Sequence, residues 1–201
     1  MDAIETLMNE HRVIEQVLDA LVGFAQEVDR RGSTEKEELG RFVTFVREFA
    51  DACHHGKEED ILFAAMVEHG FPRDGGPIAV MLNEHDQGRA LVRVLRSRAE
   101  AGGAWSDADR RELGAAASAF ATMLRAHIHK EDAILYPMAE QHLPPEAMAA
   151  VADACERYEQ DEARAGKHEQ LHALADELIH AHAAAVHPAA SHPPHRTGCC
   201  G

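Results

Sequence analysis

Histidine and glutamate residues interrupt the apolar stripes of long helical patterns, and this feature limits what the chain can fold into. Apolar residues recur at spacings of three and four along most of the sequence, as on a helix with one buried face. Within these stripes His11 stands between Leu7 and Ile14, and Glu131 occupies a similar place in a later pattern. Because an unpaired buried charge costs on the order of several kcal/mol, the fold must contain something that compensates these groups.

The helical patterns also define the fold class. Four long segments carry them, and each ends at a cluster of glycine, proline or polar turn residues. Long helices joined by short connections predict an all-α protein, built as an antiparallel up-down four-helix bundle. The four expected helices cover about residues 2–30, 35–69, 77–101 and 107–141.

The remainder of the chain predicts two further parts. A weaker helical pattern follows Pro145 and continues to about residue 183, with Gly166 as a place where it could break. The following residues contain few large apolar side chains and many His and Pro residues, which is typical of a disordered tail. The expected organisation is a bundle at 1–142, an additional helical segment packed on it at 143–183, and a disordered His/Pro/Cys tail at 184–201.

Charge and composition exclude several classes of protein. The 201 residues include 20 Lys and Arg against 35 Asp and Glu, so the net charge of −15 argues against binding nucleic acid or an anionic membrane. No apolar run approaches the roughly 20 residues needed to cross a bilayer, and the acidic, amphipathic first residues are not typical of a signal peptide. Four cysteines without a CxxC pair favour the reducing cytoplasm.

Two motifs occur twice along the chain. The sequence Asn-Glu-His at 9–11 returns at 83–85, and His-His-Gly-Lys-Glu-Glu-Asp at 54–60 returns with small shifts as His-Ile-His-Lys-Glu-Asp at 127–132. Nearly equal offsets of this kind predict two helix-hairpin halves related by a pseudo-twofold axis.

The repeated residues are typical metal ligands. In the pattern HxxxE the two side chains project from successive turns of one helical face, with Cβ atoms about 5–6 Å apart. A lone histidine in a core is ordinarily just hydrogen-bonded, but a matched set of six favours compensation by metal ions. Six nitrogen and oxygen donors exceed the needs of one structural zinc and suit a dinuclear site of iron or manganese, with zinc as an alternative. The predicted ligands are His11, His54, Glu58, His85, His127 and Glu131.

His55 is a further candidate ligand. Together with Glu59 it also forms an HxxxE pattern, but alignment of the two repeats on their shared Lys-Glu pair selects His54 and Glu58 instead. His55 lies about 100° around the helix from His54, so it could supply a fifth imidazole, and the sequence leaves this open.

At these motifs the chain resembles the hemerythrin-like, HHE cation-binding family. The resemblance covers about residues 1–142 and is carried by NEH at 9–11, HHGKEEDILF at 54–63, NEH at 83–85 and HIHKEDAILYP at 127–137. It implies a four-helix bundle around a non-haem di-iron centre with an oxo or hydroxo bridge. By position, Glu58 and Glu131 would bridge the two irons, and the terminal ligands would be His11, His54, His85 and His127.

The resemblance also implies a reaction with a small ligand, because an open coordination position admits oxygen, peroxide or nitric oxide. Oxygen-carrying hemerythrins have HxxxH on the third helix, whereas Met81 and Arg89 occupy the positions four residues before and after His85. This departure puts reversible oxygen carriage in doubt. Two kinds of function stay open. One is stress defence by catalase-like or nitric-oxide-detoxifying turnover, and the alternative is a non-catalytic oxygen or iron sensor or an iron-binding module.

Four other features stand apart from these motifs. The segment His168–His172 matches HExxH, the zincin signature, but the third zinc ligand of those proteases is missing, so we expect an exposed helix. Cys53 is expected to be a small packed core residue, and Glu15 a solvated one. The tail histidines and Cys199-Cys200 could bind metal, and composition alone does not decide this.

Overall fold

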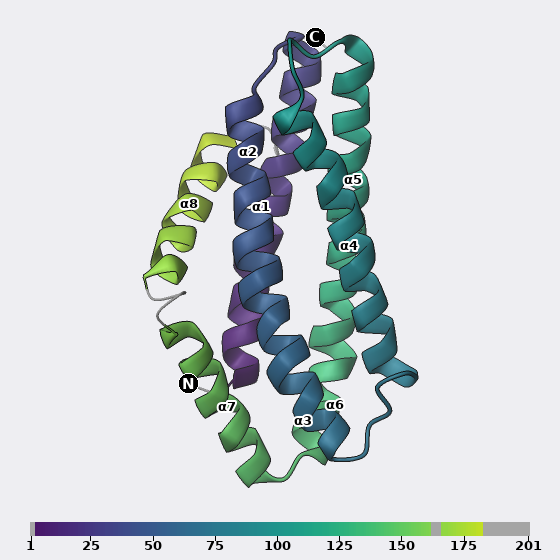
Figure 1. Ribbon diagram of the computed structural model, residues 1–201, viewed down its shortest axis with the longest axis vertical. Coiled ribbons are helices and arrows are strands. Elements are labelled where there is room, and N and C mark those ends of the chain that lie inside the picture. Colours follow the sequence, from purple (N-terminus) through teal and green to yellow (C-terminus); the bar gives the residue numbers. More distant parts are fainter. Residues whose placement is uncertain (1–2, 162–165, 183–201) are drawn as a thin grey trace, which may run out of the picture.

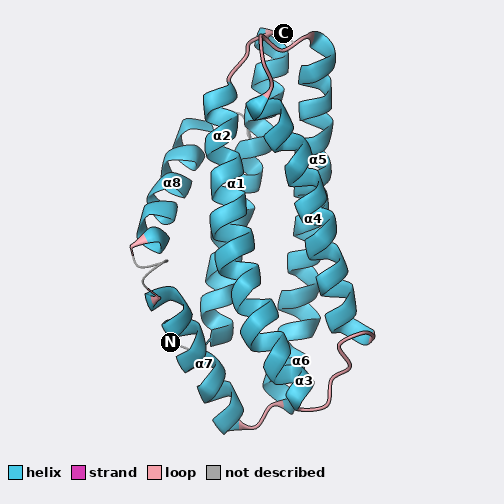
Figure 2. Cartoon of the chain, in the orientation of Figure 1, coloured by secondary structure: helices cyan, strands magenta, loops and turns pink. Residues whose placement is uncertain are grey.

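Four long helical segments lie side by side along the long axis of the molecule (Figure 1). The computed structural model describes residues 3–161 and 166–182, and throughout this part the chain is all-helical, with loops confined to the helix ends (Figure 2). The first and third segments are α1 (Ala3–Arg31) and α4 (Gly76–Glu100). The second combines α2 (Lys36–Phe45), η1 (Val46–His55), η2 (Glu58–Leu62) and α3 (Phe63–Glu68), and the fourth combines α5 (Asp107–Lys130), η3 (Glu131–Leu135) and α6 (Tyr136–His142).

Local sequence explains where these segments begin and end. The Ser106 hydroxyl accepts a hydrogen bond from the Asp109 backbone N–H, and the Asp109 carboxylate accepts one from the Ser106 backbone N–H, which forms a capping box at the start of α5. Gly32 follows α1 with a φ of 66°, a conformation that favours glycine. The all-helical prediction is therefore confirmed, with bounds within about two residues of those expected.

The second and fourth segments contain π-helical stretches, named η1, η2 and η3. Glu58 is the first residue of η2 and Glu131 is the first residue of η3. A π-turn changes the direction in which the following side chains project, and such turns are frequent at functional sites. The sequence analysis did not anticipate them.

The C-terminal region forms two helices instead of one. α7 (Pro145–Gln160) and α8 (Lys167–His182) are separated where Gly166 has a φ of 75°, as the position of this glycine suggested. Both lie on the outside of the four long segments (Figure 1): α7 contacts α1 and η2, and α8 contacts α1, α2 and η1. The tail expected at 184–201 lies outside the described residues.

The buried apolar residues form two clusters, one at each end of the molecule. One contains Leu21, Phe42 and Leu113, and the other contains Leu7, Leu62 and Leu135. A layer of buried polar groups lies between them, since His11 stands on α1 between Leu7 of one cluster and Ile14 of the other. None of the described helices is long and apolar enough to cross a membrane.

Candidate metal centre

The structure brings the six predicted ligands together in this polar layer. They come from all four long segments, and none of their side chains is more than 1% exposed: His11, His54, Glu58, His85, His127 and Glu131. Their ring nitrogens and carboxylate oxygens form two adjoining groups, in each of which the donor atoms lie within 4.8 Å of one another. One group contains His11, His54, Glu58 and Glu131, and the other contains His55, Glu58, His85 and His127.

The two carboxylates occupy the middle of the site. Glu58 belongs to both groups, and its Oε2 lies 3.8 Å from His54 Nε2 and 3.4 Å from His85 Nε2. Glu131 is placed similarly, because its Oε2 lies 3.3 Å from His11 Nε2 and its Oε1 lies 3.1 Å from His127 Nε2. Each carboxylate therefore has one group of histidines on either side, which is the arrangement a bridging ligand requires.

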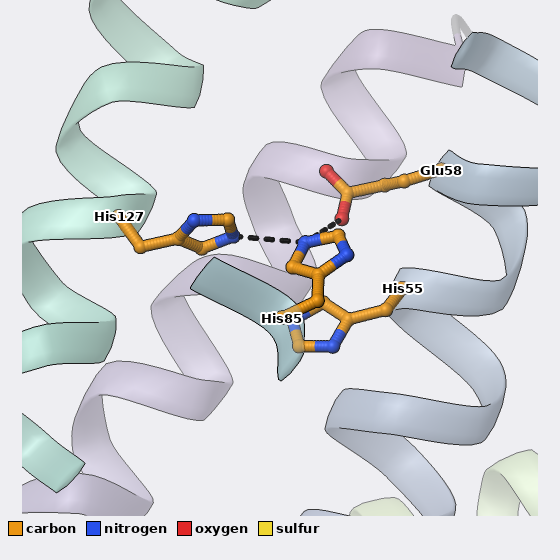
Figure 3. Close-up of side chains that lie close together, drawn as sticks. All are labelled: His55, Glu58, His85 and His127. Carbon is orange, nitrogen blue, oxygen red and sulfur yellow. Dashed lines mark hydrogen bonds and ion pairs between the residues drawn. The ribbon is translucent and has the colours of Figure 1, made fainter. Parts of the chain in front are cut away.

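The second group places His55 against the predicted ligands (Figure 3). Its ring stacks on that of His85, with centroids 3.8 Å apart, and the side chain is buried. The Nε2 atoms of His85 and His127 are 3.0 Å apart and point toward one another. His55 is thus close enough to be a fifth nitrogen donor, and whether it binds metal stays a prediction.

Each of these histidines is held by a carboxylate at its other ring nitrogen. A carboxylate can only accept, so the Nδ1 atom carries the proton and donates it. The donor–acceptor distances are 2.7 Å from His11 to Asp132, 2.8 Å from His54 to Glu10, 2.6 Å from His85 to Glu59, 2.9 Å from His127 to Glu84 and 3.4 Å from His55 to Asp51.

This protonation pattern makes the centre fit metal ions. In the neutral form with Nδ1 protonated, which is the form that binds metal, each imidazole turns the lone pair of Nε2 toward the carboxylates, which also offer only lone pairs. Consistent with this, Glu58 Oε2 and both oxygens of Glu131 are buried without a hydrogen-bond donor. Lone pairs of several donors facing one another need cations between them, and histidines oriented by carboxylates are the usual surroundings of a metal site.

The electrostatics of the cluster also favour positive charge at its centre. Burial alone would raise the pKa of Glu131, but His11, His127 and His85 hold it well below its usual range. Burial alone would lower the pKa of His85, but the carboxylates of Glu131, Glu58 and Glu59 raise it to about 11. Burial and the neighbouring His85 charge lower the pKa of His55 to about 4, so this ring stays neutral.

The supporting carboxylates follow the sequence repeat. Glu10 and Glu84 precede the histidines of the two NEH motifs, and each binds the HxxxE histidine of its own half. Glu59 and Asp132 follow the two bridging candidates, and each binds the NEH histidine of the other half. The sequence analysis missed all four, although the motifs that carry them were already identified. Their regular recurrence beside the ligands was the available signal.

Lysine residues extend the repeat by one further contact. Lys57 binds Glu10, and Lys130 binds Glu84. The two contacts differ in their surroundings, because Lys57 is fully buried under α7 and also binds Glu159 at 2.5 Å, whereas Lys130 is about one third exposed. The C-terminal helices thus cover one half of the site and leave the equivalent half near solvent.

One tyrosine completes the interior of the site. The Tyr136 hydroxyl donates to Glu58 Oε1 at 2.7 Å, and its ring stacks on His11 with centroids 5.5 Å apart. Burial and the charge of Glu58 raise the pKa of Tyr136 well above its usual value. The position equivalent to Tyr136 in the first half is Phe63, which packs against His85 and offers no hydroxyl.

The remaining sequence candidates have these surroundings. Cys53 is buried, as predicted, and Glu15 is partly exposed and accepts a hydrogen bond from Arg12 at 2.7 Å. The HExxH segment is not the exposed helix that we expected: His168 and His172 pack on Phe49 of η1. His168 Nε2 also lies 3.4 Å from Glu10.

Comparisons with known proteins agree with this centre. The model of the hemerythrin HHE cation binding domain matches residues 2–139. Two similar relatives are the uncharacterized proteins Mb2018 of Mycobacterium bovis and Rv1995 of Mycobacterium tuberculosis, each 24% identical over 164 residues, covering 81% of this chain and 62% of the relative. The iron-sulfur cluster repair protein YtfE of Musicola paradisiaca is 37% identical over 94 residues, covering 43% of this chain and 40% of that protein.

The chain thus spans less than two thirds of the length of these curated relatives. No solved structure matches it. The family match covers more than half of the sequence and includes every predicted ligand and the carboxylates that orient them. The chain therefore belongs to the hemerythrin HHE cation binding domain family.

Proposed function

We propose that the chain is a cytoplasmic non-haem di-iron protein whose centre binds or reacts with oxygen, peroxide or nitric oxide, within an antiparallel up-down bundle of the hemerythrin type. The observation that carries the proposal is the pair of donor groups that share Glu58, with Glu131 contacting histidines of both. Glu58 and Glu131 would bridge the metal ions. His11 and His54 would be terminal on one side, with His85, His127 and His55 on the other.

The residues around the centre prepare it for this chemistry. Bound iron would supply electrons and Lewis acidity. Asp132, Glu10, Glu59 and Glu84 fix the orientation of the terminal histidines and hold the proton at Nδ1, so that Nε2 is the nitrogen offered to a metal. Tyr136 holds one oxygen of Glu58 and supplies a hydroxyl donor inside the buried polar layer. The two apolar clusters exclude bulk water from both ends of the polar layer.

Metal analysis with an optical spectrum tests the metal assignment. We expect about two irons per chain and near-ultraviolet charge-transfer absorption. Glu131→Ala and Glu58→Ala should each lose the dinuclear spectrum, because each removes a bridge. Glu15→Ala removes a carboxylate four residues after His11 that lies outside the site, and should keep both irons. Retention of two irons by Glu131→Ala would refute the bridging assignment.

Turnover is tested separately on the iron-loaded protein. Consumption of peroxide or nitric oxide faster than by an equal amount of free iron would support an enzyme. Consumption no faster than by free iron would contradict the proposal of an enzyme, but it would not contradict the proposed metal centre.

One observation favours the alternative of a non-catalytic sensor or iron-binding module. Glu10 contacts His54 of the centre, Lys57, and His168 of α8. A change of the metal state that moves His54 would therefore reach the outer helices through one carboxylate, where a partner could recognise it. Hydrogen exchange of α8 that differs between reduced and oxidised protein, in the absence of turnover, would support this function.

A further inference from the structure

A cavity of about 230 Å³ opens beside the centre, between η1, α4 and α5. His55 and His85 form part of its wall, so it reaches the second donor group directly. Its volume is several times the roughly 30 Å³ that one water occupies in the liquid. Oxygen, peroxide and nitric oxide each have two heavy atoms, and the cavity is larger than any of them requires.

The wall has two chemically different parts. The inner part is apolar and made of buried side chains: Val46, Ala50, Val92, Phe120 and Leu124. Gly88 also lines it, and a Cβ there would come within 3.2 Å of Met123 Cε, so the wall is closely packed at this point. An apolar surface of this kind favours a ligand with a hydrocarbon body.

The other part of the wall is cationic. Arg47, Arg89, Arg93 and Arg96 line the cavity, against the single carboxylate of Asp51. This excess runs against the composition of a chain with a net charge of −15, where carboxylates outnumber basic groups. A cationic cavity wall on an acidic protein indicates an anionic ligand.

The four arginines differ in whether they already form ion pairs with carboxylates of the protein. Arg89 is bound by Asp51 at 2.8 Å and Glu59 at 2.7 Å, and Arg96 by Glu100 at 2.7 Å. Arg47 and Arg93 are exposed and have no hydrogen bond or ion pair with any described residue. Their guanidinium groups are therefore available to a ligand.

We propose that this cavity binds a small organic monocarboxylate, with its hydrocarbon body in the apolar part against His55 and its carboxylate bound by Arg47 and Arg93. Two guanidinium groups are well suited to a carboxylate, because each presents N–H donors in a planar fork. This proposal rests on the proposed function and adds to it an organic ligand, bound next to one of the two donor groups of the centre. Binding itself does not require turnover.

Calorimetric titration of the iron-loaded full chain with benzoate tests the proposal, with hexanoate as a second probe. We expect one saturable site per chain for benzoate, and much weaker binding of benzamide, which has the same shape without the charge. Inorganic phosphate should bind at least about tenfold more weakly than benzoate, because it can use the arginines but not the apolar part. Equal binding of benzoate and benzamide, or binding of phosphate as tight as that of benzoate, would overturn the proposal.

Matched variants locate the site. The double variant Arg47→Gln/Arg93→Gln should weaken benzoate about tenfold or more, since charge-assisted hydrogen bonds are lost. Arg73→Gln/Arg111→Gln changes two exposed arginines away from the cavity and should bind normally. Ala50→Leu fills the apolar part and should abolish binding. An equal loss in both double variants, or unchanged binding to folded Ala50→Leu, contradicts the site.

Metal content, measured on every sample, separates this proposal from the proposed function. Loss of benzoate binding with two irons retained concerns the cavity alone. Absence of iron from the unmodified protein would refute the metal centre whatever the outcome with benzoate.

Discussion

At the scale of single residues, the site depends on carboxylates that do not themselves face the centre. Glu10 is the most heavily used of them, because it is buried, contacts His54 and Lys57, and lies near His168. Burial alone would raise the pKa of Glu10, but hydrogen bonds from His168 and His54 and the charge of Lys57 hold it far below its usual range. The residue is therefore a charged anchor for the imidazole of His54.

Replacement of Glu10 tests this role. Glu10→Gln should lower the affinity for iron by about 10- to 100-fold, the usual effect of removing the acceptor that orients a metal-bound histidine. The effect is measured as the rate and extent of iron loss to a chelator. Glu15→Gln is the matched control on the same helix and should leave iron retention unchanged. Equal retention by both variants would mean that Glu10 does not orient the ligand.

Tyr136 offers a second test at this scale. Tyr136→Phe removes the hydroxyl that donates to Glu58, and should lower the free energy of unfolding by about 1–2 kcal/mol. The ring itself should fit, because Phe63 occupies the equivalent position in the other half. Denaturant unfolding of iron-loaded protein provides the measurement, and an unchanged midpoint would show that the hydroxyl contributes nothing.

At the scale of elements, the sequence was most informative where its periodicity was strongest. The four long helices and the burial of the six candidate ligands could be predicted, because an apolar stripe fixes which face is buried and HxxxE fixes which side chains share it. The π-helical starts at Glu58 and Glu131 could not, since they depend on packing of the whole helix. Gly166 marked where the fifth helical stretch could break, and α7 and α8 are separated there. His168 was assigned to solvent because its partner Glu10 is 158 positions away in the sequence.

The packing of α7 on the second long segment makes a prediction at this scale. A Cβ added to Gly56 would collide with the hydroxyl of Tyr158 and lie 3.0 Å from its Cζ, and that hydroxyl donates to the carbonyl of Ala52 at 2.9 Å. Gly56→Ala should therefore destabilise the protein by about 1–3 kcal/mol, measured by denaturant unfolding.

Gly114 is the control for this effect, because it is also helical and a Cβ there meets nothing within 4 Å. Gly114→Ala should stabilise the protein by about 0.5–1 kcal/mol through helix propensity alone. Addition of Tyr158→Ala to Gly56→Ala should recover part of the loss. If Gly56→Ala behaves like Gly114→Ala, α7 does not pack on the ligand-bearing helix as described.

At the scale of the whole molecule, the polar layer predicts that the stability of the fold depends on bound metal. Two buried carboxylates and several imidazoles lie between the apolar clusters, and a metal that binds only the folded chain adds to its stability. Removal of iron should lower the melting temperature by on the order of 10 °C. A calorimetric scan before and after chelation checks this, and readdition of iron should restore the original value. An unchanged melting temperature would show that the centre does not hold the fold together.

Acid should lower the free energy of unfolding, because it protonates Asp51 and Glu59, two carboxylates that contact Arg89. Burial alone would raise the pKa values of Asp51 and Glu59, but histidine and arginine partners lower each to about 2, below the ordinary values of 3.8 and 4.5. A lowered folded-state pKa contributes stability above the unfolded-state pKa and loses it as pH falls through the folded one. Stability should therefore fall between about pH 5 and pH 2, and less steeply in Asp51→Asn. The same slope in both proteins would exclude Asp51 as a source.

α7 and α8 cover only one of the two repeated halves, so the two sides of the centre differ in their exposure to solvent although the sequence is internally duplicated. The Glu10–Lys57 side is enclosed by α7, while the Glu84–Lys130 side is more exposed and the cavity with the free arginines opens at His55 and His85. We therefore expect small molecules to reach the donors from the side of the cavity, and the donors under α7 to stay out of contact with solvent.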